Sequence, residues 1–180
     1  TQRFDSVTPD MEDPKELKKF LELIRSLSAK GAILAYHDRS DGGLAAALCE
    51  MMFASHVGVE IVADALVSKD RTLNQALFNE ELGAVIQVAR GRAAEVERDF
   101  EAAGMGWSLK YLGNLTQDDH LNIYLEGKCV LSEDRVDLQK AWNEVSWQIA
   151  RMRDNPECAD SEYELISDKH NGGLVLTMGF

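Results

Sequence analysis

The sequence has few basic residues for its number of acidic ones, and it lacks any long hydrophobic run. Its 180 residues include 19 Lys and Arg against 31 Asp and Glu, so the formal net charge at pH 7 is −12. Nucleic acids and anionic membranes carry the same sign of charge, so the composition gives no general reason to bind either. No stretch approaches the roughly 18 apolar residues that a membrane-spanning helix requires. We therefore expect no nucleic acid and no membrane as partners.

Cysteine is also scarce. Cys49, Cys129 and Cys158 are odd in number and far apart, without the paired spacings of zinc ribbons or redox motifs. We expect free thiols in a reducing compartment. The opening segment is polar rather than a signal peptide, which favours a cytoplasmic location. The sequence shows no Ser-His-Asp order, zinc-ligand spacing, Walker loop or internal repeat, so none of these architectures is predicted.

The composition is that of an ordinary globular domain, with 45% hydrophobic and 28% charged residues. A chain of this length buries roughly 70% of its unfolded surface and needs no disulfide or metal to fold. Residue 1 is Thr and the opening stretch has no obvious structural role, so we expect that the chain was cut from a longer one. We predict a linker over residues 1–13, an α/β domain over 14–154 and a connector over 155–180.

The order of helical and strand patterns indicates an α/β fold, in which a mixed sheet is flanked by helices. Apolar periodicity and end signals predict helices over residues 14–30, 44–55, 71–80, 92–103 and 136–153. Short apolar and β-branched runs predict strands over residues 32–36, 57–62, 84–88, 107–112, 121–125 and 129–131. We expect the strands at 32–36 and 84–88 to be buried, and Trp142 to lie in the core.

The most informative stretch is His37–Leu44, where two aspartates, a serine and two glycines separate an apolar strand from an apolar helix. Glycines allow a tight turn, the N–H groups at a helix start bind phosphate, and carboxylates can hold the magnesium ion that neutralises it. In the alternative interpretation, Ser40 or Asp41 caps the helix and the glycines only make the turn. The residues alone leave both interpretations open.

A second polar stretch, Leu77–Gly83, places the acidic pair Glu80 and Glu81 just before a predicted strand. These residues are either part of a site or ordinary residues of a turn or helix end. His37 precedes the acidic turn and is positioned to orient Asp38. The other histidines lie in predicted loops without a partner in view, and none is predicted to be a catalytic base.

Three long motifs, in the same order, are similar to the large phosphoribosylformylglycinamidine synthases. The segment LAYHDRSDGGL (Leu34–Leu44) resembles their acidic glycine motif. The segments LFNEELGAVIQV (Leu77–Val88) and WQIARMRDNPECAD (Trp147–Asp160) resemble the same family. The resemblance extends over nearly the whole chain, from about Lys15 to Asp160.

Members of that family are multidomain, glutamine-dependent ligases of de novo purine synthesis. They convert formylglycinamide ribonucleotide, ATP and glutamine into formylglycinamidine ribonucleotide, ADP, phosphate and glutamate. The resemblance implies that this chain is their second C-terminal α/β domain, a type shared with aminoimidazole ribonucleotide (AIR) synthetase and selenophosphate synthetase, followed by the linker toward the glutaminase. Its partners would be the remaining domains of the same polypeptide, namely the synthetase core and the glutaminase. The isolated chain would be inactive, and we predict no catalytic residue in it.

The resemblance also implies an auxiliary nucleotide site that holds ATP or ADP with Mg²⁺. It assigns a magnesium ligand to Asp38 and a nucleotide contact to Ser40, whereas we expect Asp41, Gly42 and Gly43 to shape the turn. For Asn79, Glu80 and Glu81 the hypothesis is the wall of a ligand cleft. Two alternatives remain, a different ATP-dependent synthetase of the same superfamily and a non-catalytic interaction module. The motif over residues 153–160 argues against the former.

Overall fold

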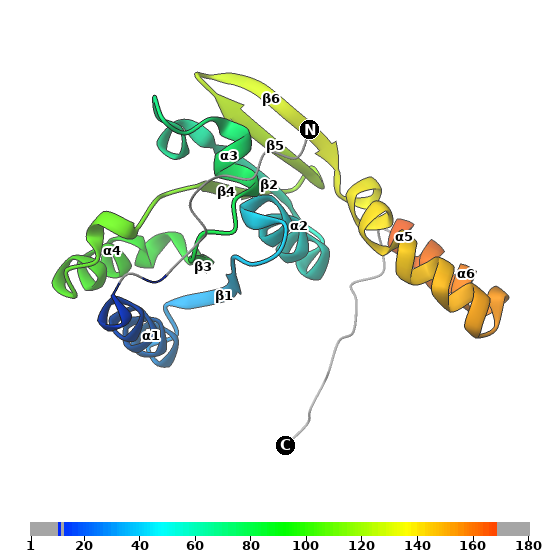
Figure 1. Cartoon of the computed structure of the whole chain (residues 1–180), viewed down its shortest axis with the longest axis horizontal. Coiled ribbons are helices and arrows are strands. Elements are labelled where there is room, and N and C mark those ends of the chain that lie inside the picture. Colours follow the sequence, from blue (N-terminus) through cyan, green and yellow to red (C-terminus); the bar gives the residue numbers. More distant parts are fainter. Residues whose placement is uncertain (1–10, 12, 169–180) are drawn as a thin grey trace. The chain divides into compact units, whose positions relative to one another are not determined.

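The structure, a computed structural model, describes residue 11 and residues 13–168 (Figure 1). The chain divides into two compact units. The first contains the residues up to Ala47 together with Val67–Tyr111, and the second contains Leu48–Leu66 and the residues from Leu112 onward. Helix α2 (Gly43–Ser55) contributes residues to both. Within the described part of the chain, no helix is long and apolar enough to cross a membrane.

The first unit contains a two-stranded antiparallel sheet. Strand β1 (Ile33–Asp38) pairs with β3 (Ala84–Val88), with Asp38 opposite Ala84. The other elements of this unit are α1 (Pro14–Ala29), α3 (Leu73–Phe78), the 3₁₀ turn η2 (Arg90–Arg92), α4 (Ala93–Ala102) and the 3₁₀ turn η3 (Gly106–Ser108). They confirm the helices predicted for this part of the chain, with small shifts at their ends.

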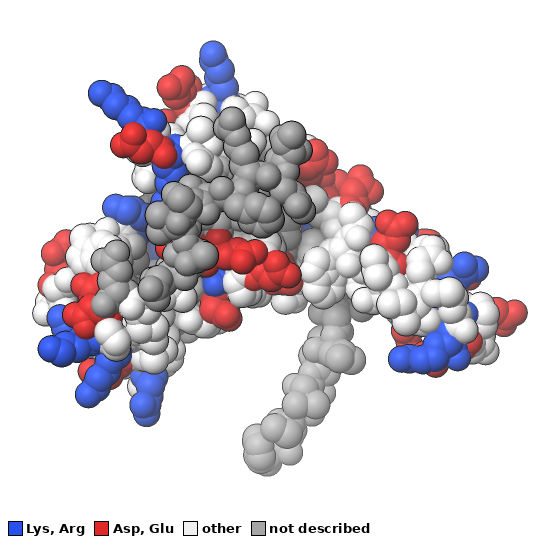
Figure 2. All heavy atoms as spheres, viewed as in Figure 1, with Lys and Arg blue, Asp and Glu red and all other residues white. Residues whose placement is uncertain are grey.

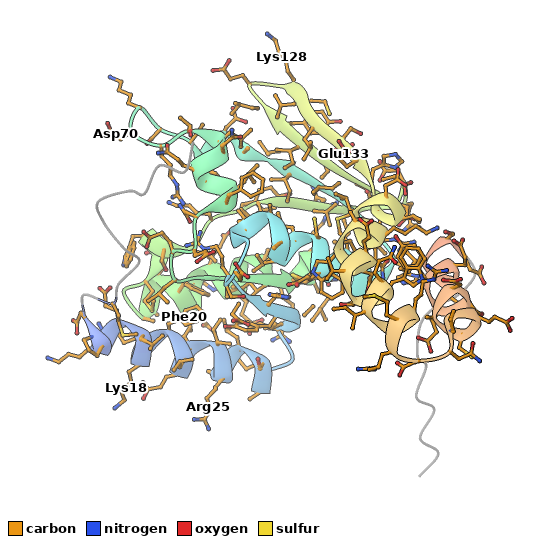
Figure 3. The ribbon with its side chains drawn as sticks, turned by 45° about the vertical axis from the view of Figure 1, so that its right-hand side comes forward. Lys18, Phe20, Arg25, Asp70, Lys128 and Glu133 are labelled. Atoms are coloured by element: carbon orange, nitrogen blue, oxygen red, sulfur yellow. The ribbon has the colours of Figure 1, made fainter. Side chains whose placement is uncertain are left out.

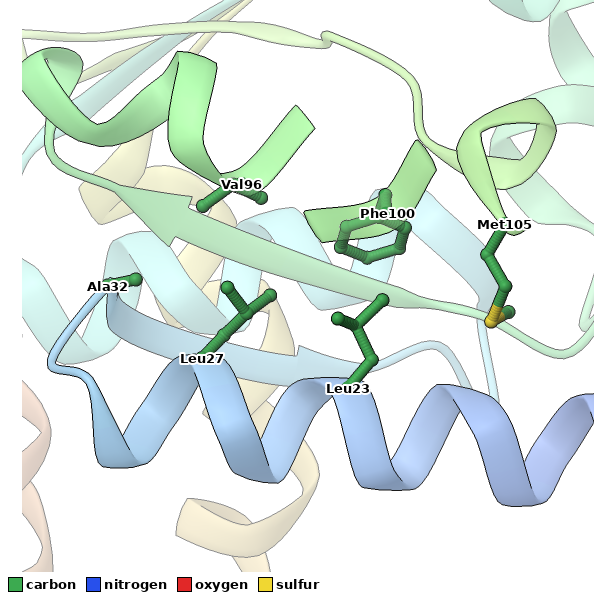
Figure 4. Close-up of a cluster of buried hydrophobic side chains, with 6 residues drawn as sticks. All are labelled: Leu23, Leu27, Ala32, Val96, Phe100 and Met105. Carbon is green, nitrogen blue, oxygen red and sulfur yellow. The ribbon is translucent and has the colours of Figure 1, made fainter. Parts of the chain in front are cut away.

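The core of the first unit lies between α1 and α4. Its buried side chains are Leu23, Leu27, Ala32, Val96, Phe100 and Met105 (Figure 4). Ile33 of β1 and Ile86 of β3 pack against this cluster from the sheet. On α1, Phe20 lies on the core side, whereas Lys18 and Arg25 point away from it (Figure 3). The apolar periodicity of α1 therefore buries one side of the helix, and each fully buried leucine contributes about 1.5–3 kcal/mol.

The second unit contains a four-stranded mixed sheet with two helices after it. Its elements are β2 (Gly58–Val62), the 3₁₀ turn η1 (Ala63–Leu66), β4 (Gly113–Thr116), β5 (His120–Leu125), β6 (Lys128–Asp134), α5 (Arg135–Arg153), α6 (Pro156–Glu164) and the 3₁₀ turn η4 (Leu165–Ser167). The strand order is β4-β2-β5-β6, with β2 and β5 parallel and the other pairs antiparallel. This confirms the predicted α/β class with a mixed sheet.

Strands β5 and β6 form an antiparallel hairpin. Glu126 and Gly127 both have positive φ, 52° and 71°, as a two-residue turn that matches the twist of the strands requires. The Glu126 N–H donates to the Asp64 carboxylate of η1 (3.2 Å), which ties the turn to the rest of this unit. Lys128 marks the tip of the hairpin in Figure 3.

A buried ion pair joins the end of this sheet to α5. Arg135, only 1% exposed, donates from Nε to Oδ1 of Asp119 (2.5 Å) and from Nη2 to its Oδ2 (3.1 Å). Its Nη1 donates to Oε1 of Gln139 (2.6 Å), and its backbone N–H donates to the Asp119 carbonyl (2.9 Å). The guanidinium is therefore bonded on three nitrogens, which fixes the first turn of α5 against the turn before β5.

Helices α5 and α6 form a hairpin. Asn155 caps α6, since its side chain accepts from the Glu157 N–H (2.9 Å), and Pro156 occupies the first turn. Trp147 of α5 stacks on Tyr163 of α6 with ring centroids 4.2 Å apart. The segment predicted as a connector over residues 155–180 therefore contains a packed helix as far as Glu164. Residues 169–180 of that segment, and residues 1–10 and 12 of the linker predicted over 1–13, lie outside the described residues.

Two further predictions about exposure are wrong. Strand β1 is not buried, because α1 and α4 cover only the side on which Ile33 lies, and Leu34 and Tyr36 on the other side are 59% and 43% exposed. Trp142 is 59% exposed rather than in the core. Its ring packs in a tilted arrangement against Phe53 of α2, at a centroid distance of 5.8 Å.

The strand predicted over residues 107–112 is also wrong. The Ser108 N–H donates to the Met105 carbonyl (3.0 Å) and the Leu109 N–H to the Gly106 carbonyl (3.2 Å), so local bonds form η3 instead of a ladder. The Ser108 hydroxyl also donates to the Met105 carbonyl (2.7 Å). Within this segment Trp107 and Tyr111 are exposed, whereas Leu109 packs against the buried cluster of this unit.

All three cysteines are free thiols, as predicted. Cys129 and Cys158 are exposed, whereas Cys49 on α2 is half-buried. Burial, together with the charge of Glu50, raises the pKa of Cys49 to about 11. This thiol therefore stays protonated at neutral pH and is chemically the least reactive form of cysteine.

The ion pair between Arg135 and Asp119 yields a stability prediction. We expect Asp119→Asn to lower the free energy of unfolding by about 3 kcal/mol, because it leaves a buried guanidinium without a countercharge. Urea denaturation monitored by circular dichroism measures the change. Glu22→Gln, which removes the exposed pair with Lys18, is the control and should change stability by less than about 0.5 kcal/mol. An equal, small effect of both variants would contradict the anchoring role of Arg135.

Candidate functional site

The candidate site is the turn that joins β1 to α2. Asp38 is the last residue of β1, and Asp38, Ser40 and Asp41 are all exposed. Gly42 and Gly43 follow with φ of 79° and 69°, two consecutive residues in the left-handed region that side chains disfavour. The predicted role of these glycines in shaping the turn is confirmed. The turn therefore presents one hydroxyl and two carboxylates on a backbone that only glycine adopts readily.

At Gly43 the start of α2 lies directly against the end of α3. A Cβ atom on Gly43 would lie 2.6 Å from the carbonyl oxygen of Asn79 and 2.8 Å from that of Leu77. Asn79 ends α3, and its N–H donates to the Gln75 carbonyl (3.1 Å). The two polar stretches singled out in the sequence are thus brought together, a contact that neither stretch predicts by itself.

Arg39, in the first polar stretch (His37–Leu44), donates hydrogen bonds to the second (Leu77–Gly83). Its Nε donates to the Glu81 carbonyl (2.5 Å) and its Nη2 to the Leu82 carbonyl (3.2 Å). Its backbone N–H donates to the Gly83 carbonyl (2.8 Å), which extends the β1–β3 ladder by one bond. Arg39 is not among the predicted site residues. The sequence offers one signal for its role, because Arg39 is a single basic residue between two aspartates in a strongly acidic chain.

The charges around this turn act on one another. Burial and then the positive charge of Arg71 lower the pKa of Arg39, and the Glu81 carboxylate opposes them. Arg39 remains a cation at neutral pH, because guanidinium groups do not deprotonate in proteins. Burial and then the charge of Asp38 raise the pKa of Tyr36, which lies on the same side of β1. Asn79 adds a buried side-chain oxygen with no hydrogen-bond donor in the described part of the chain.

The hydrogen bonds also bear on the alternative interpretation of the turn. The Gly43 N–H donates to the Ser40 carbonyl (2.9 Å), so the backbone closes the turn. Among the described residues, no bond from α2 to the side chain of Ser40 or Asp41 occurs, and the capping interpretation has no support. His37 donates from Nδ1 to the backbone oxygen of Asp38 (2.7 Å), and this bond orders the strand end rather than the carboxylate.

The side chains of the β1–α2 turn can supply one carboxylate ligand to a magnesium ion that is also bound by a nucleotide. Within residues 11 and 13–168, no group of three or more His, Cys, Asp or Glu side chains gathers as a metal site. Mg²⁺ is commonly bound by one or two carboxylates together with nucleotide phosphates and water. Asp38 is an exposed carboxylate beside a glycine turn and fits this arrangement as one ligand. The turn therefore suits a magnesium ion that arrives with a nucleotide, not a bare ion.

Comparison with solved structures shows that this fold is shared with PurL and HypE. PurL of Thermotoga maritima complexed with FGAR has a TM-score of 0.62 and 16% identity, over 71% of this chain and 21% of that chain. The same protein complexed with ATP gives 0.60 and 16%, over 70% and 22%. A HypE–HypF complex gives 0.51 and 22%, over 63% and 39%. The chain thus spans about a fifth of the length of the PurL chains, and these identities establish the fold.

A family described as AIR synthase related protein, C-terminal domain, matches residues 2–126. The match covers more than half of the chain and ends in the β5–β6 turn. It includes the whole β1–α2 turn and the 79–83 stretch that Arg39 holds, whereas α5 and α6 lie beyond it. The chain therefore belongs to the family of AIR synthase related proteins and contains their C-terminal domain.

Proposed function

We propose that this chain is the second C-terminal AIR-synthase-like domain of a large phosphoribosylformylglycinamidine synthase. That enzyme is the ATP- and glutamine-dependent ligase that forms formylglycinamidine ribonucleotide in cytoplasmic purine biosynthesis. The three sequence motifs support this assignment, and so does the likeness of the fold to PurL, which was solved with FGAR and with ATP. The chain spans about a fifth of PurL, so its partners are the rest of the synthetase core and a glutaminase. By itself it is inactive.

The observation that carries the proposal is the exposed pair Asp38 and Ser40 on the glycine turn before α2. In this proposal the Ser40 hydroxyl contacts a nucleotide phosphate and Asp38 ligates Mg²⁺. The start of α2 faces the same turn, and the N–H groups of a first helical turn favour a phosphate. Arg39 keeps the turn in place through the 81–83 carbonyls.

The role of the chain's own residues is binding and positioning. Nucleotide phosphates are repelled by a chain of net charge −12, so their charge must be offset locally. Bound magnesium would neutralise phosphate charge, and Asp38 would hold it against the turn. No residue of the turn is assigned a proton transfer, which agrees with a supporting rather than a reacting nucleotide.

A non-catalytic module is the second candidate, and one observation favours it. Gly43 and Arg39 both have structural roles. Gly43 allows α2 to pack on the end of α3, and Arg39 donates hydrogen bonds to the carbonyls of Glu81 and Leu82. In that case the backbone conformation of the turn serves only the packing of α2 against α3. Asp38 and Ser40 are then exposed without binding a ligand. Nucleotide binding separates the two candidates.

The proposed nucleotide site yields a prediction about ligand-dependent stability. We expect Mg²⁺ with ADP, at about 100 times the dissociation constant, to stabilise the folded chain by about 2.7 kcal/mol and raise Tm by roughly 5–10 °C. Asp38→Asn should abolish this rise. Asp41→Asn, which changes the neighbouring exposed aspartate of the same turn, is the control and should retain it. Differential scanning calorimetry with and without each ligand measures the shift. A rise that survives Asp38→Asn contradicts the role of Asp38, and no rise at all favours the non-catalytic module.

A further prediction tests the architecture of the turn. We expect Gly43→Ala to lower the free energy of unfolding by about 2 kcal/mol or more, because a Cβ there meets the Leu77 and Asn79 backbone at a disfavoured φ. Gly91→Ala is the matched control, since a Cβ at Gly91 meets nothing within 4 Å. It should be neutral or stabilise by up to about 1 kcal/mol. Urea denaturation compares the two, and equal stabilities would contradict the close approach.

A further inference from the structure

Strand β1 carries a line of exposed side chains that leads to the proposed magnesium ligand. Burial alternates along the strand, and the exposed positions are Leu34, Tyr36 and Asp38. The exposed fractions are 59% for Leu34 and 43% for Tyr36. Side chains two residues apart on a strand point to the same side, and their Cα atoms lie about 6.6 Å apart. An apolar, an aromatic and an anionic group therefore follow one another toward the β1–α2 turn.

Tyr36 has no partner of its own in the described part of the chain. Its ring stacks on no other described aromatic ring, and no described residue forms a hydrogen bond with its hydroxyl. Burial and then the negative charge of Asp38 raise the pKa of Tyr36, so the phenol lies within electrostatic reach of that carboxylate and is neutral at pH 7. A neutral aromatic ring is therefore accessible to a ligand beside Asp38.

The charge of the chain limits what its contacts with phosphate can contribute. The net charge of −12 repels phosphate. In the face shown in Figure 2, Lys and Arg side chains are scattered among Asp and Glu side chains instead of forming one broad basic surface. Magnesium offsets phosphate charge, but it does so for any polyphosphate. Preference for a nucleotide over free phosphates therefore has to come from contacts with its uncharged part.

We propose that Tyr36 is the stacking platform for the base of the nucleotide whose magnesium ion Asp38 binds. This inference rests on the proposed function and names the part of the ligand that the site selects. The order of groups along β1 matches their order in a nucleotide, in which a sugar separates the base from the metal-bound phosphates. Leu34 continues the line by one step and offers apolar surface beyond the ring of Tyr36.

Stacking also defines the class of nucleotide. Base–aromatic stacking tolerates different bases, because every base has a π-face. Purines have a larger face than pyrimidines and bury more apolar area on an aromatic ring. We therefore expect ADP and GDP to bind with similar affinity and UDP to bind more weakly. Pyrophosphate, which has the phosphates without a base, should also bind more weakly than ADP.

Isothermal titration calorimetry of the whole chain with Mg²⁺ tests the platform. Tyr36→Ala should weaken ADP binding about tenfold or more, abolish the preference for ADP over UDP and leave pyrophosphate binding unchanged. Tyr36→Phe keeps the ring and should retain the affinity for ADP. Tyr111→Ala is the matched control, since it removes a tyrosine of the same unit that is 67% exposed and does not lie on β1. It should change the binding of none of these ligands.

The outcomes separate this inference from the proposed function. If ADP binding depends on Asp38 but is indifferent to Tyr36→Ala, only the platform is contradicted. A preference for ADP over UDP that survives Tyr36→Ala would contradict it as well. Equal losses of ADP and pyrophosphate binding in a folded Tyr36→Ala variant would show that Tyr36 shapes the turn instead. If the unaltered chain binds neither ligand, the platform and the proposed function are both wrong.

Folding of each variant is checked separately. Circular dichroism melting shows whether Tyr36→Ala retains the structure of the unaltered chain. If it does not, Tyr36→Thr takes its place in the same titrations, because a β-branched side chain suits a strand and has no ring. The same loss of ADP binding, with pyrophosphate binding retained, is expected for it.

Discussion

At Gly43 two stretches of backbone approach each other more closely than any side chain would allow. The carbonyl oxygens of Leu77 and Asn79 lie 2.8 Å and 2.6 Å from the place a Cβ would take, so the start of α2 packs directly on the end of α3. Arg39 then bonds to the carbonyls that follow. This close approach and the bonds of Arg39 position the turn on which Asp38 and Ser40 are exposed. The proposed nucleotide site depends on this constraint.

The starts of helices and the positions of turns could be predicted from interactions between neighbouring residues. Pro14 marks the first turn of α1, and Gly42 and Gly43 mark the turn before α2. Asn155 and Pro156, which follow the end of α5, cap and begin α6. Signals that act within a few residues are visible in a sequence, since capping and φ preferences depend on neighbours alone.

Contacts between distant residues were not predictable in the same way. The approach of Gly43 to Asn79 depends on how two helices pack, and no single stretch encodes it. The exposure of Leu34 on β1 and of Trp142 on α5 depends on which side of an element is covered, whereas hydrophobicity alone suggested burial. Arg39 was missed for the same reason, because its partners are carbonyl oxygens that carry no mark in the sequence.

The central claim is that a magnesium nucleotide binds at the β1–α2 turn. The most direct measurement is paramagnetic broadening of backbone amide NMR signals, with Mn²⁺ in place of Mg²⁺ and ADP present. We predict that broadening centres on the amides of residues 38–44, requires the nucleotide and disappears in Asp38→Asn. Broadening centred elsewhere, such as the acidic turn at Asp118 and Asp119, or broadening that is independent of ADP, would contradict the account.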